Sequence, residues 1–386
     1  MPILALPLEI IYLIVEQLTT RDLWSVYDCC HGLRACAARF LFCKVSIKFD
    51  ESTPALLNAR YFRPPRSSLL QCLRQWSSYV RTVDIWGDEE MILPGFFDVL
   101  RGFDRLRARL LGHLSSHPTV ETLSVDFMSP RTWQPQMIFS HLRELHLSCI
   151  EHEPGLCILP PLPVLERLSL NFCCYCLECP KSDNGPCTQL LFEQLPQLLA
   201  LSISGARQGS IVCRGYASHL RRFELSFSTD IDLAALCPTL GVCLEEVVIA
   251  DCELVGDMAP DAQRWPYLRR LRISDSVSAV ALLGHVQLPP SADVHVRIHP
   301  TDVQHLFQWP LVLQALSTVP VTVSFSSHPD LPYPHCLPLH QLMTLPTVQI
   351  DKFDRPWLVT LLQESRTVQY LASPPQSTDS GENQSN

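Results

Sequence analysis

A short phrase of apolar and polar positions, apolar-x-x-apolar-x-apolar, recurs along the middle of the chain. It is present as HPTVETLSV, LPVLERLSL, LPQLLALSI and WPYLRRLRI, and without the proline as LRELHL, LRRFEL and LEEVVI. The copies end at Val125, Leu147, Leu170, Ile203, Leu225, Ile249 and Ile273. In the last positions of each copy, apolar and other residues alternate with a period of two. Each copy therefore predicts a short strand in which every second side chain enters a core.

The spacing of these copies predicts how the strands stack. Successive copies lie 22 to 24 residues apart, except for one step of 33 residues. A period of this length is typical of a solenoid in which each repeat packs on the one before it. Weaker copies ending at Ile85 and Ile298 extend the array, and residues 96–114 favour a helix between the first two strands. The solenoid is therefore predicted to occupy residues 80–300.

The C-terminal part follows the pattern less closely. The segment VTVSF ends at Phe325, and apolar residues alternate again at 348–350, but many prolines lie between them. Residues 301–372 are therefore predicted to form degenerate repeats or a cap, with a closing helix at 354–362. Residues 373–386, rich in Ser, Gln, Asn and Pro, are predicted to be a disordered tail.

The first residues of the chain have a helical pattern. Pro7 and Glu9 suit the first turn of a helix, and the apolar residues after them form two adjacent stripes. The stripes consist of Ile10, Ile14 and Leu18, and of Ile11 and Val15. This apolar arc is wider than a single core contact needs, so one stripe is predicted to contact a second partner.

Two more helices and a strand are predicted to follow. Thr20 or Asp22 can cap a second helix, and Gly32 separates it from a third helix at 33–42. The alternating residues 45–49 then predict a strand. Residues 50–79 are expected to be a linking helical region before the solenoid.

The N-terminal residues resemble an F-box of the fungal type in their order and spacing. The resemblance rests on Leu6-Pro7, Glu9-Ile10, Ile14, Leu18, Asp22-Leu23, Cys29-Cys30, Leu33-Arg34, Ala38-Arg39, Phe42 and Val45. In that family the first helices bind a Skp-type adaptor, which binds a cullin, and the remaining chain presents a target protein for ubiquitin transfer. The residues that the resemblance implies as contacting the adaptor, or supporting that contact, are Leu6, Pro7, Ile10, Ile14, Leu18 and Leu23. A plain helical cap on the end of the solenoid is the alternative.

The repeat phrase resembles a leucine-rich repeat, in which Asn or Cys usually follows the second strand leucine by three positions. The corresponding residues are Met128, Ile150, Cys173, Ala206, Ser228, Cys252 and Ser276. In such repeats these residues form a polar ladder along the solenoid. Only the two cysteines and, more loosely, the two serines fit it, so the solenoid is expected to be irregular. The expected fold class is α/β: a three-helix F-box-like segment over 1–49, followed by an irregular leucine-rich-repeat solenoid with a parallel sheet.

Composition narrows the classes of function. A net charge of -9, without runs of Lys and Arg among aromatics, argues against nucleic-acid binding. The apolar stretch 3–15 is too short to span a membrane, and no basic residue precedes it as in a signal peptide. The 17 cysteines, an odd number without a regular framework, favour a reducing compartment. The cytoplasm is therefore the expected location, with the nucleus as a second one.

The densest cluster of candidate metal ligands lies in the one long repeat. Cys173, Cys176, Cys179 and Cys187 fall within 15 residues and could supply four thiolates to a zinc ion. A single Cys-x-x-Cys pair without a second one equally suits buried structural cysteines, so no cofactor is predicted. The sequence also lacks a Gly-rich phosphate loop, a nucleophile elbow and a His-Glu-x-x-His motif. These absences predict a protein that is not an enzyme.

A target protein is expected on the concave strand face, where outward side chains stand clear of the core. The candidates are Glu144, His146, Arg167, Asn171, Arg222, Glu224, Glu246, Arg270 and Arg272. Their mixed charges favour a protein partner over a polyanion. The sequence thus predicts the target-recruiting subunit of a Skp-cullin-F-box type ubiquitin ligase, or else a repeat scaffold with no ligase role.

Overall fold

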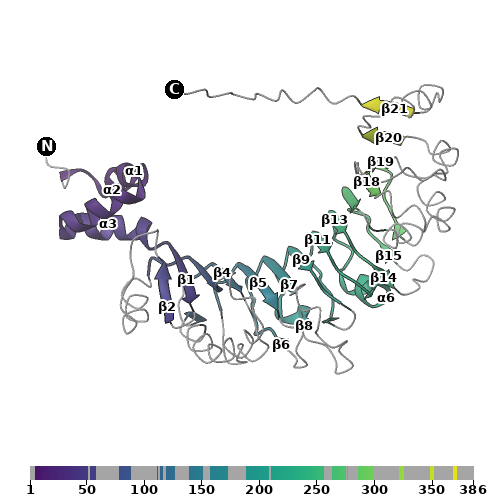
Figure 1. Cartoon of the computed structure of the whole chain (residues 1–386), viewed down its shortest axis with the longest axis horizontal. Helices are drawn as coiled ribbons and strands as arrows, with labels where there is room; N and C mark the ends of the chain where they lie inside the picture. The colour runs from purple at the N-terminus through teal and green to yellow at the C-terminus, as the bar shows by residue number, and fades with distance from the viewer. Residues whose placement is uncertain are drawn as a thin grey trace, which may run out of the picture. The chain divides into compact units, whose positions relative to one another are not determined.

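A computed structural model describes residues 5–50, 53–57, 78–87, 111, 114–115, 119–126, 139–150, 157–172, 188–207, 210–255, 263–274, 276, 286–298, 321–325, 348–351 and 368–371. The chain divides into two units. Figure 1 labels helices and strands of both. The first comprises Met1–Leu244 with Leu254–Asp257, and the second comprises Glu245–Glu253 with Met258–Asn386.

Three helices open the first unit: α1 (Leu8–Glu16), α2 (Thr20–Cys29) and α3 (His31–Leu41). The predicted cap of the second helix at Thr20 or Asp22 is wrong, because Thr19 caps α2. Thr19 has an extended backbone, so its Oγ1 faces the first turn and accepts a hydrogen bond from the Asp22 N–H at 3.3 Å. The same hydroxyl donates to the Asp22 carboxylate at 2.6 Å. Asp22 therefore holds the Thr19 side chain in place, and Thr19 is the capping residue.

The three helices share one apolar core. Its buried members are Ile11, Val15, Leu23, Leu33, Cys36, Ala37, Ala38, Leu41 and Phe42. Tyr79 packs against this cluster from the residues just before the next strand of the sheet. In addition, the N–H groups of Arg81 and Thr82 both donate to the Cys43 carbonyl at 2.9 Å. The helical segment is thus tied to the start of the sheet by packing and by backbone hydrogen bonds.

The first unit continues as a sheet of parallel strands in chain order. They are β1 (Lys44–Asp50), β3 (Thr82–Gly87), β4 (Thr122–Asp126), β5 (Glu144–Ile150), β7 (Arg167–Phe172), β9 (Ala200–Ser204) and β11 (Arg222–Ser226). Segments between them form a smaller parallel sheet of β6 (Cys157–Ile158), β8 (Thr188–Leu191) and β10 (Ile211–Arg214). A further short pair joins β12 (Ile231–Asp232) to β14 (Leu254–Val255). Three single turns are η5 (Phe192–Gln194), α6 (Leu233–Leu236) and η6 (Cys237–Thr239).

One segment of the predicted linking helical region is a strand instead. Residues Thr53–Leu57 form β2, which pairs antiparallel with β1 through the register Ile47↔Leu56. The physical reason is that the outer edge of β1 carries backbone groups with no other strand beside them, and a return strand satisfies these groups. Pro54 is compatible with a strand at a sheet edge. The rest of 50–79, apart from residues 50, 78 and 79, lies outside the described residues.

The second unit repeats the parallel arrangement. Its strands β13 (Glu246–Ala250), β16 (Arg270–Ser274), β18 (Asp293–Ile298) and β19 (Val321–Phe325) lie side by side in this order. Two short parallel pairs accompany them: β15 (Gln263–Arg264) with β17 (Val286–Gln287), and β20 (Val348–Asp351) with β21 (Val368–Leu371).

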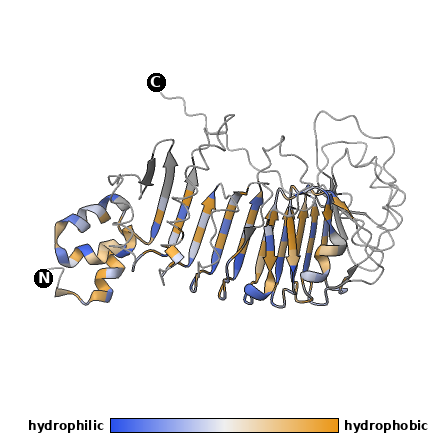
Figure 2. Cartoon of the chain, turned by 90° about the horizontal axis from the view of Figure 1, so that it is seen from below, coloured by the Kyte–Doolittle hydropathy of each residue, from blue (hydrophilic) through white to orange (hydrophobic). Residues whose placement is uncertain are grey.

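Hydrophobic and hydrophilic residues alternate along the strands (Figure 2), and the apolar positions of the repeat phrase are buried as predicted. In each of nine parallel strands (β3, β4, β5, β7, β9, β11, β13, β16 and β18), two side chains face the core and are at most 2% exposed. These pairs are Val83 and Ile85, Leu123 and Val125, Leu145 and Leu147, Leu168 and Leu170, Leu201 and Ile203, Phe223 and Leu225, Val247 and Ile249, Leu271 and Ile273, and Val294 and Val296. Three N-terminal helices followed by a parallel β-solenoid are therefore confirmed.

The remaining structural predictions have mixed outcomes. The strands expected at the ends of the array, including those near Phe325 and at 348–350, are present. Of the helix predicted at 96–114, Leu111 and Leu114 are helical and buried, and most other residues lie outside the described part. The predicted closing helix at 354–362 and the tail at 373–386 also lie outside it. The predicted domain boundaries stay predictions.

In each unit, a serine just after a strand forms a hydrogen bond with the preceding turn of the solenoid. In the first unit, the Ser228 hydroxyl accepts from the Ala206 N–H at 3.1 Å and donates to the Ser226 carbonyl at 2.8 Å. In the second, the Ser276 hydroxyl accepts from the Cys252 N–H at 3.0 Å and also contacts the Cys252 carbonyl. Both serines occupy the position where the repeat phrase predicted a polar ladder.

Candidate interaction surfaces

The first candidate surface is the outer side of α1. Ile10, Leu13 and Ile14 are 42%, 58% and 38% exposed, whereas Ile11 and Val15 are 5% and 2% exposed. Residues at i, i+3 and i+4 share one side of a helix, so the three exposed side chains form a continuous apolar stripe, here called the α1 stripe. Of the two stripes predicted from the sequence, Ile11 and Val15 enter the core, whereas Ile10 and Ile14 of the other stripe are exposed.

The other adaptor candidates are distributed between this surface and the core. Pro7 is exposed at the start of α1, and Leu6 and Leu18 are half-buried against the helical core. Leu23 is buried in that core, so its side chain supports the helices and is not part of the surface. The sequence analysis missed Leu13, although its position three residues after Ile10 was the available signal.

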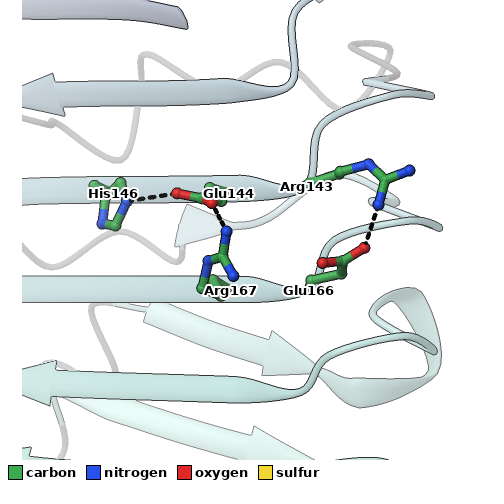
Figure 3. A network of polar contacts seen from close by, with 5 residues as sticks. All are labelled: Arg143, Glu144, His146, Glu166 and Arg167. Atoms are coloured by element: carbon green, nitrogen blue, oxygen red, sulfur yellow. Dashed lines mark hydrogen bonds and ion pairs between the residues drawn. The ribbon is translucent and has the colours of Figure 1, made fainter.

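The second candidate surface is the face of the sheet opposite the core. All nine predicted residues on this face lie at outward strand positions. Five of them begin a strand, and the other four lie between two buried neighbours: His146, Asn171, Glu224 and Arg272. Several of them pair with one another (Figure 3). Glu144 contacts Arg167 on the next strand and lies 3.7 Å from His146 Nε2 on its own strand. Arg222 and Glu224 are 3.3 Å apart. Exposed pairs of this kind contribute little stability, about 0 to 1 kcal/mol, so their charges stay available to a partner.

A row of charges at the N-terminal edge of the strands was missed in the sequence. Arg81 pairs with Glu121 on the next turn, and Arg143 pairs with Glu166 at 2.6 Å (Figure 3). In the second unit, Arg269 Nη1 lies 3.8 Å from a Glu245 carboxylate oxygen. Each of these residues immediately precedes a strand. The signal in the sequence was that a positive and a negative residue alternate at this position from one repeat to the next.

Small polar side chains dominate the outward face of the first unit. They are Ser124, Ser148, Ser169, Asn171, Ser202, Ser204 and Ser226. These short side chains allow another protein to approach closely and offer hydrogen-bonding groups.

Eight cysteines are free thiols: Cys29, Cys30, Cys36, Cys43, Cys213, Cys237, Cys243 and Cys252. Burial raises the pKa of Cys237 to about 12, and burial likewise raises that of Cys213 to about 12, although the Thr239 side chain opposes the shift by hydrogen bonding. Thiols of this kind are weak nucleophiles and weak metal ligands. Among the described residues, no three His, Cys, Asp or Glu side chains gather closely enough to bind a metal ion. The predicted candidates Cys173, Cys176, Cys179 and Cys187 lie outside these residues.

No protein-family model matches the chain, and a search of curated proteins found no matching sequence. Within the described residues, no helix is long and apolar enough to cross a bilayer.

Proposed function

We propose that this protein is a target-recruiting subunit of a Skp-cullin-F-box type ubiquitin ligase. The α1–α3 segment would bind a Skp-type adaptor and through it a cullin, and the solenoid would hold a target protein. The observation that supports this proposal most directly is the α1 stripe. Three large apolar side chains are exposed on a helix whose opposite side is already packed, in the segment that resembles an F-box.

The energetic argument concerns the exposed apolar area. Burying an aliphatic side chain of this size contributes about 1.5 to 3 kcal/mol. Three adjacent side chains can therefore anchor a protein interface, in which a few apolar residues supply most of the binding energy. Pro7 extends the same surface at the helix start, as the family resemblance implies.

No bond chemistry is assigned to this chain. A subunit of this kind would act by holding its target near the ubiquitin carrier, which raises the effective concentration of the two reactants. The outward sheet face, with its paired charges and short hydroxyl side chains, would form the target surface. Such a protein would act in the cytoplasm or the nucleus.

A repeat scaffold with no ligase role is the second candidate, because the contacts of Tyr79 and of the Cys43 carbonyl also suit a helical cap on the sheet. Co-purification with a Skp-type adaptor separates the two. We expect wild type to form a stoichiometric complex, and the variant Ile10→Asp/Ile14→Asp to stay folded but lose the adaptor. Leu6→Ala/Pro7→Ala should weaken the complex through the same surface.

A matched control is available in the same unit. Val242 and Val255 are 42% and 37% exposed, close to the values of Ile10 and Ile14. The variant Val242→Asp/Val255→Asp should therefore keep the adaptor. A folded, monodisperse wild type that does not bind the adaptor would contradict the ligase proposal and favour the scaffold. Unfolding of the Ile10→Asp/Ile14→Asp variant, with the control folded, would favour the cap.

A further inference from the structure

The outward face of the second unit carries a small cationic patch. On β16 and β18, the middle and last outward positions are Arg272 and Ser274, and His295 and Arg297. The strand register places Arg272 beside His295 and Ser274 beside Arg297. Arg272 and Arg297 are exposed, and His295 is half-buried. We name Arg272, His295 and Arg297 the β16–β18 patch.

No acidic side chain occupies the corresponding positions of the neighbouring strand β13. There the middle and last outward residues are Val248 and Ala250, and Val248 pairs in register with Arg272. Acidic residues of this face lie at the first outward position instead, where Glu246, Arg270 and Asp293 are aligned across the three strands. Arg270 is thus flanked by two acidic residues, whereas the register neighbours of Arg272 on β13 and β18 are Val248 and His295.

The first unit has the opposite pattern at the same positions. The middle and last outward residues described from β3 to β11 include Asp84, Asp126 and Glu224, but no lysine or arginine. These positions therefore carry no lysine or arginine from β3 to β11, although β1 of the same unit has Lys48 in register with Trp86.

The geometry of the patch sets the kind of ligand. Aligned side chains on neighbouring strands are about 5 Å apart, and outward neighbours along one strand are about 6.6 Å apart. Alternate side chains of an extended peptide are also about 6.6 Å apart. Carboxylates at every second position of such a peptide can therefore reach Arg272, His295 and Arg297 together. The guanidinium groups can bind carboxylates through paired hydrogen bonds.

We infer that the β16–β18 patch binds a short acidic peptide segment of a partner protein. A peptide fits better than a nucleic acid, because the patch spans only two strands and the whole chain carries a net charge of -9, which repels a long polyanion. The inference deepens the proposed function. That the peptide belongs to a ligase target rests on the proposed function, whereas binding of the peptide to the patch does not depend on it.

The test uses the full chain and a short labelled peptide with glutamate at alternate positions, titrated by fluorescence anisotropy up to about 1 mM protein. We expect saturable binding that weakens when salt is raised from about 50 to about 200 mM, because exposed charges are screened. The variant Arg272→Glu/Arg297→Glu should bind at least about tenfold more weakly, since it reverses two contacting charges. A peptide with serine in place of each glutamate should not bind.

The matched control is Arg207→Glu/Arg214→Glu, which makes the same change in net charge on the first unit, away from the outward sheet face, and should leave the affinity within about twofold. No binding at about 1 mM, equal loss in both variants, or tighter binding of a single-stranded RNA than of the peptide would each overturn the inference. Co-purification with the Skp-type adaptor is measured on the same samples. A variant that keeps the adaptor but loses the peptide separates the two proposals, and so does a wild type that binds the peptide without the adaptor.

Discussion

Ser228 and Ala206 lie 22 residues apart in the chain but are joined by a buried hydrogen bond, in which the Ala206 N–H donates to the Ser228 hydroxyl at 3.1 Å. The hydroxyl donates in turn to the Ser226 carbonyl. Ser228 is fully buried, so water cannot replace either bond. One short side chain therefore satisfies the backbone of two successive turns of the solenoid.

Replacement of Ser228 by alanine is expected to lower the free energy of unfolding by about 1 to 3 kcal/mol, because the Ala206 N–H would be left buried without its acceptor. The check is the urea midpoint of unfolding. Ser202→Ala removes a hydroxyl from the outward face and should change stability by less than about 0.5 kcal/mol. Equal effects of the two changes would show that the hydrogen bonds of Ser228 contribute no more to stability than an exposed hydroxyl does.

Phe227 has a left-handed backbone with φ of 49° and a side chain that is 64% exposed. A bulky residue is strained there, by roughly 1 to 2 kcal/mol, and little burial is lost when the ring is removed. Phe227→Gly is therefore expected to raise the free energy of unfolding by about 0.5 to 1 kcal/mol, after the larger entropy loss of glycine on folding is subtracted. Thermal unfolding measures the change.

Gly205 has a φ of 69° and lies just before Ala206, as Phe227 lies just before Ser228. Replacing this glycine by a larger residue is therefore the opposite test. A Cβ at Gly205 would lie 2.7 Å from the Phe172 carbonyl oxygen. Gly205→Ala should therefore destabilise the protein by about 1 to 3 kcal/mol. Destabilisation by Phe227→Gly as well would mean that the exposed ring makes contacts worth more than the backbone strain.

The two sides of α1 should respond differently to truncation. Ile11→Ala removes a core side chain and is expected to cost about 2 to 5 kcal/mol of folding stability. Ile10→Ala changes an exposed side chain and should alter stability by less than about 0.5 kcal/mol. Chemical denaturation of both variants gives the comparison. Similar costs at the two positions would mean that the α1 stripe is packed within the chain.

Burial of Cys213 and Cys237 should be visible in their reactivity. With a pKa of about 12, only about one in ten thousand of either thiol is ionised at pH 8, against about a quarter of an ordinary thiol of pKa ~8.5. Iodoacetamide at pH 8 should therefore modify exposed Cys29 first, and mass spectrometry of the peptides would show it. Urea should make all three react alike; early labelling of Cys237 in native protein would contradict its burial.

The same thiols predict a loss of stability at alkaline pH. Because the folded state retains these protons to higher pH than the unfolded state, the unfolded state binds fewer protons between about pH 9 and 12. The contribution of these thiols is fully present below about pH 9 and is lost as pH rises toward 12. Cys213→Ser/Cys237→Ser should flatten the pH dependence of the urea midpoint over this range.

The sequence by itself determined which residues enter the core. Pairs such as Leu168 and Leu170 were identified because a strand alternates its side chains locally, whatever its neighbours are. The same holds for the start of α1, where Pro7 and Glu9 are local signals. A period of 22 to 24 residues was enough to predict that the strands stack in parallel.

Only the tertiary structure decided which groups meet across turns. The apolar arc of α1 indicated two stripes, but burial of Ile11 and exposure of Ile10 depend on where α2 and α3 pack. The bond between Ser228 and Ala206 and the pairing of Arg143 with Glu166 depend on the register of successive turns. The sequence pattern shows that a side chain is buried or charged, but it does not show which residue lies beside it. That partner depends on the register of neighbouring strands, which is set by connecting segments that have no repeating sequence pattern.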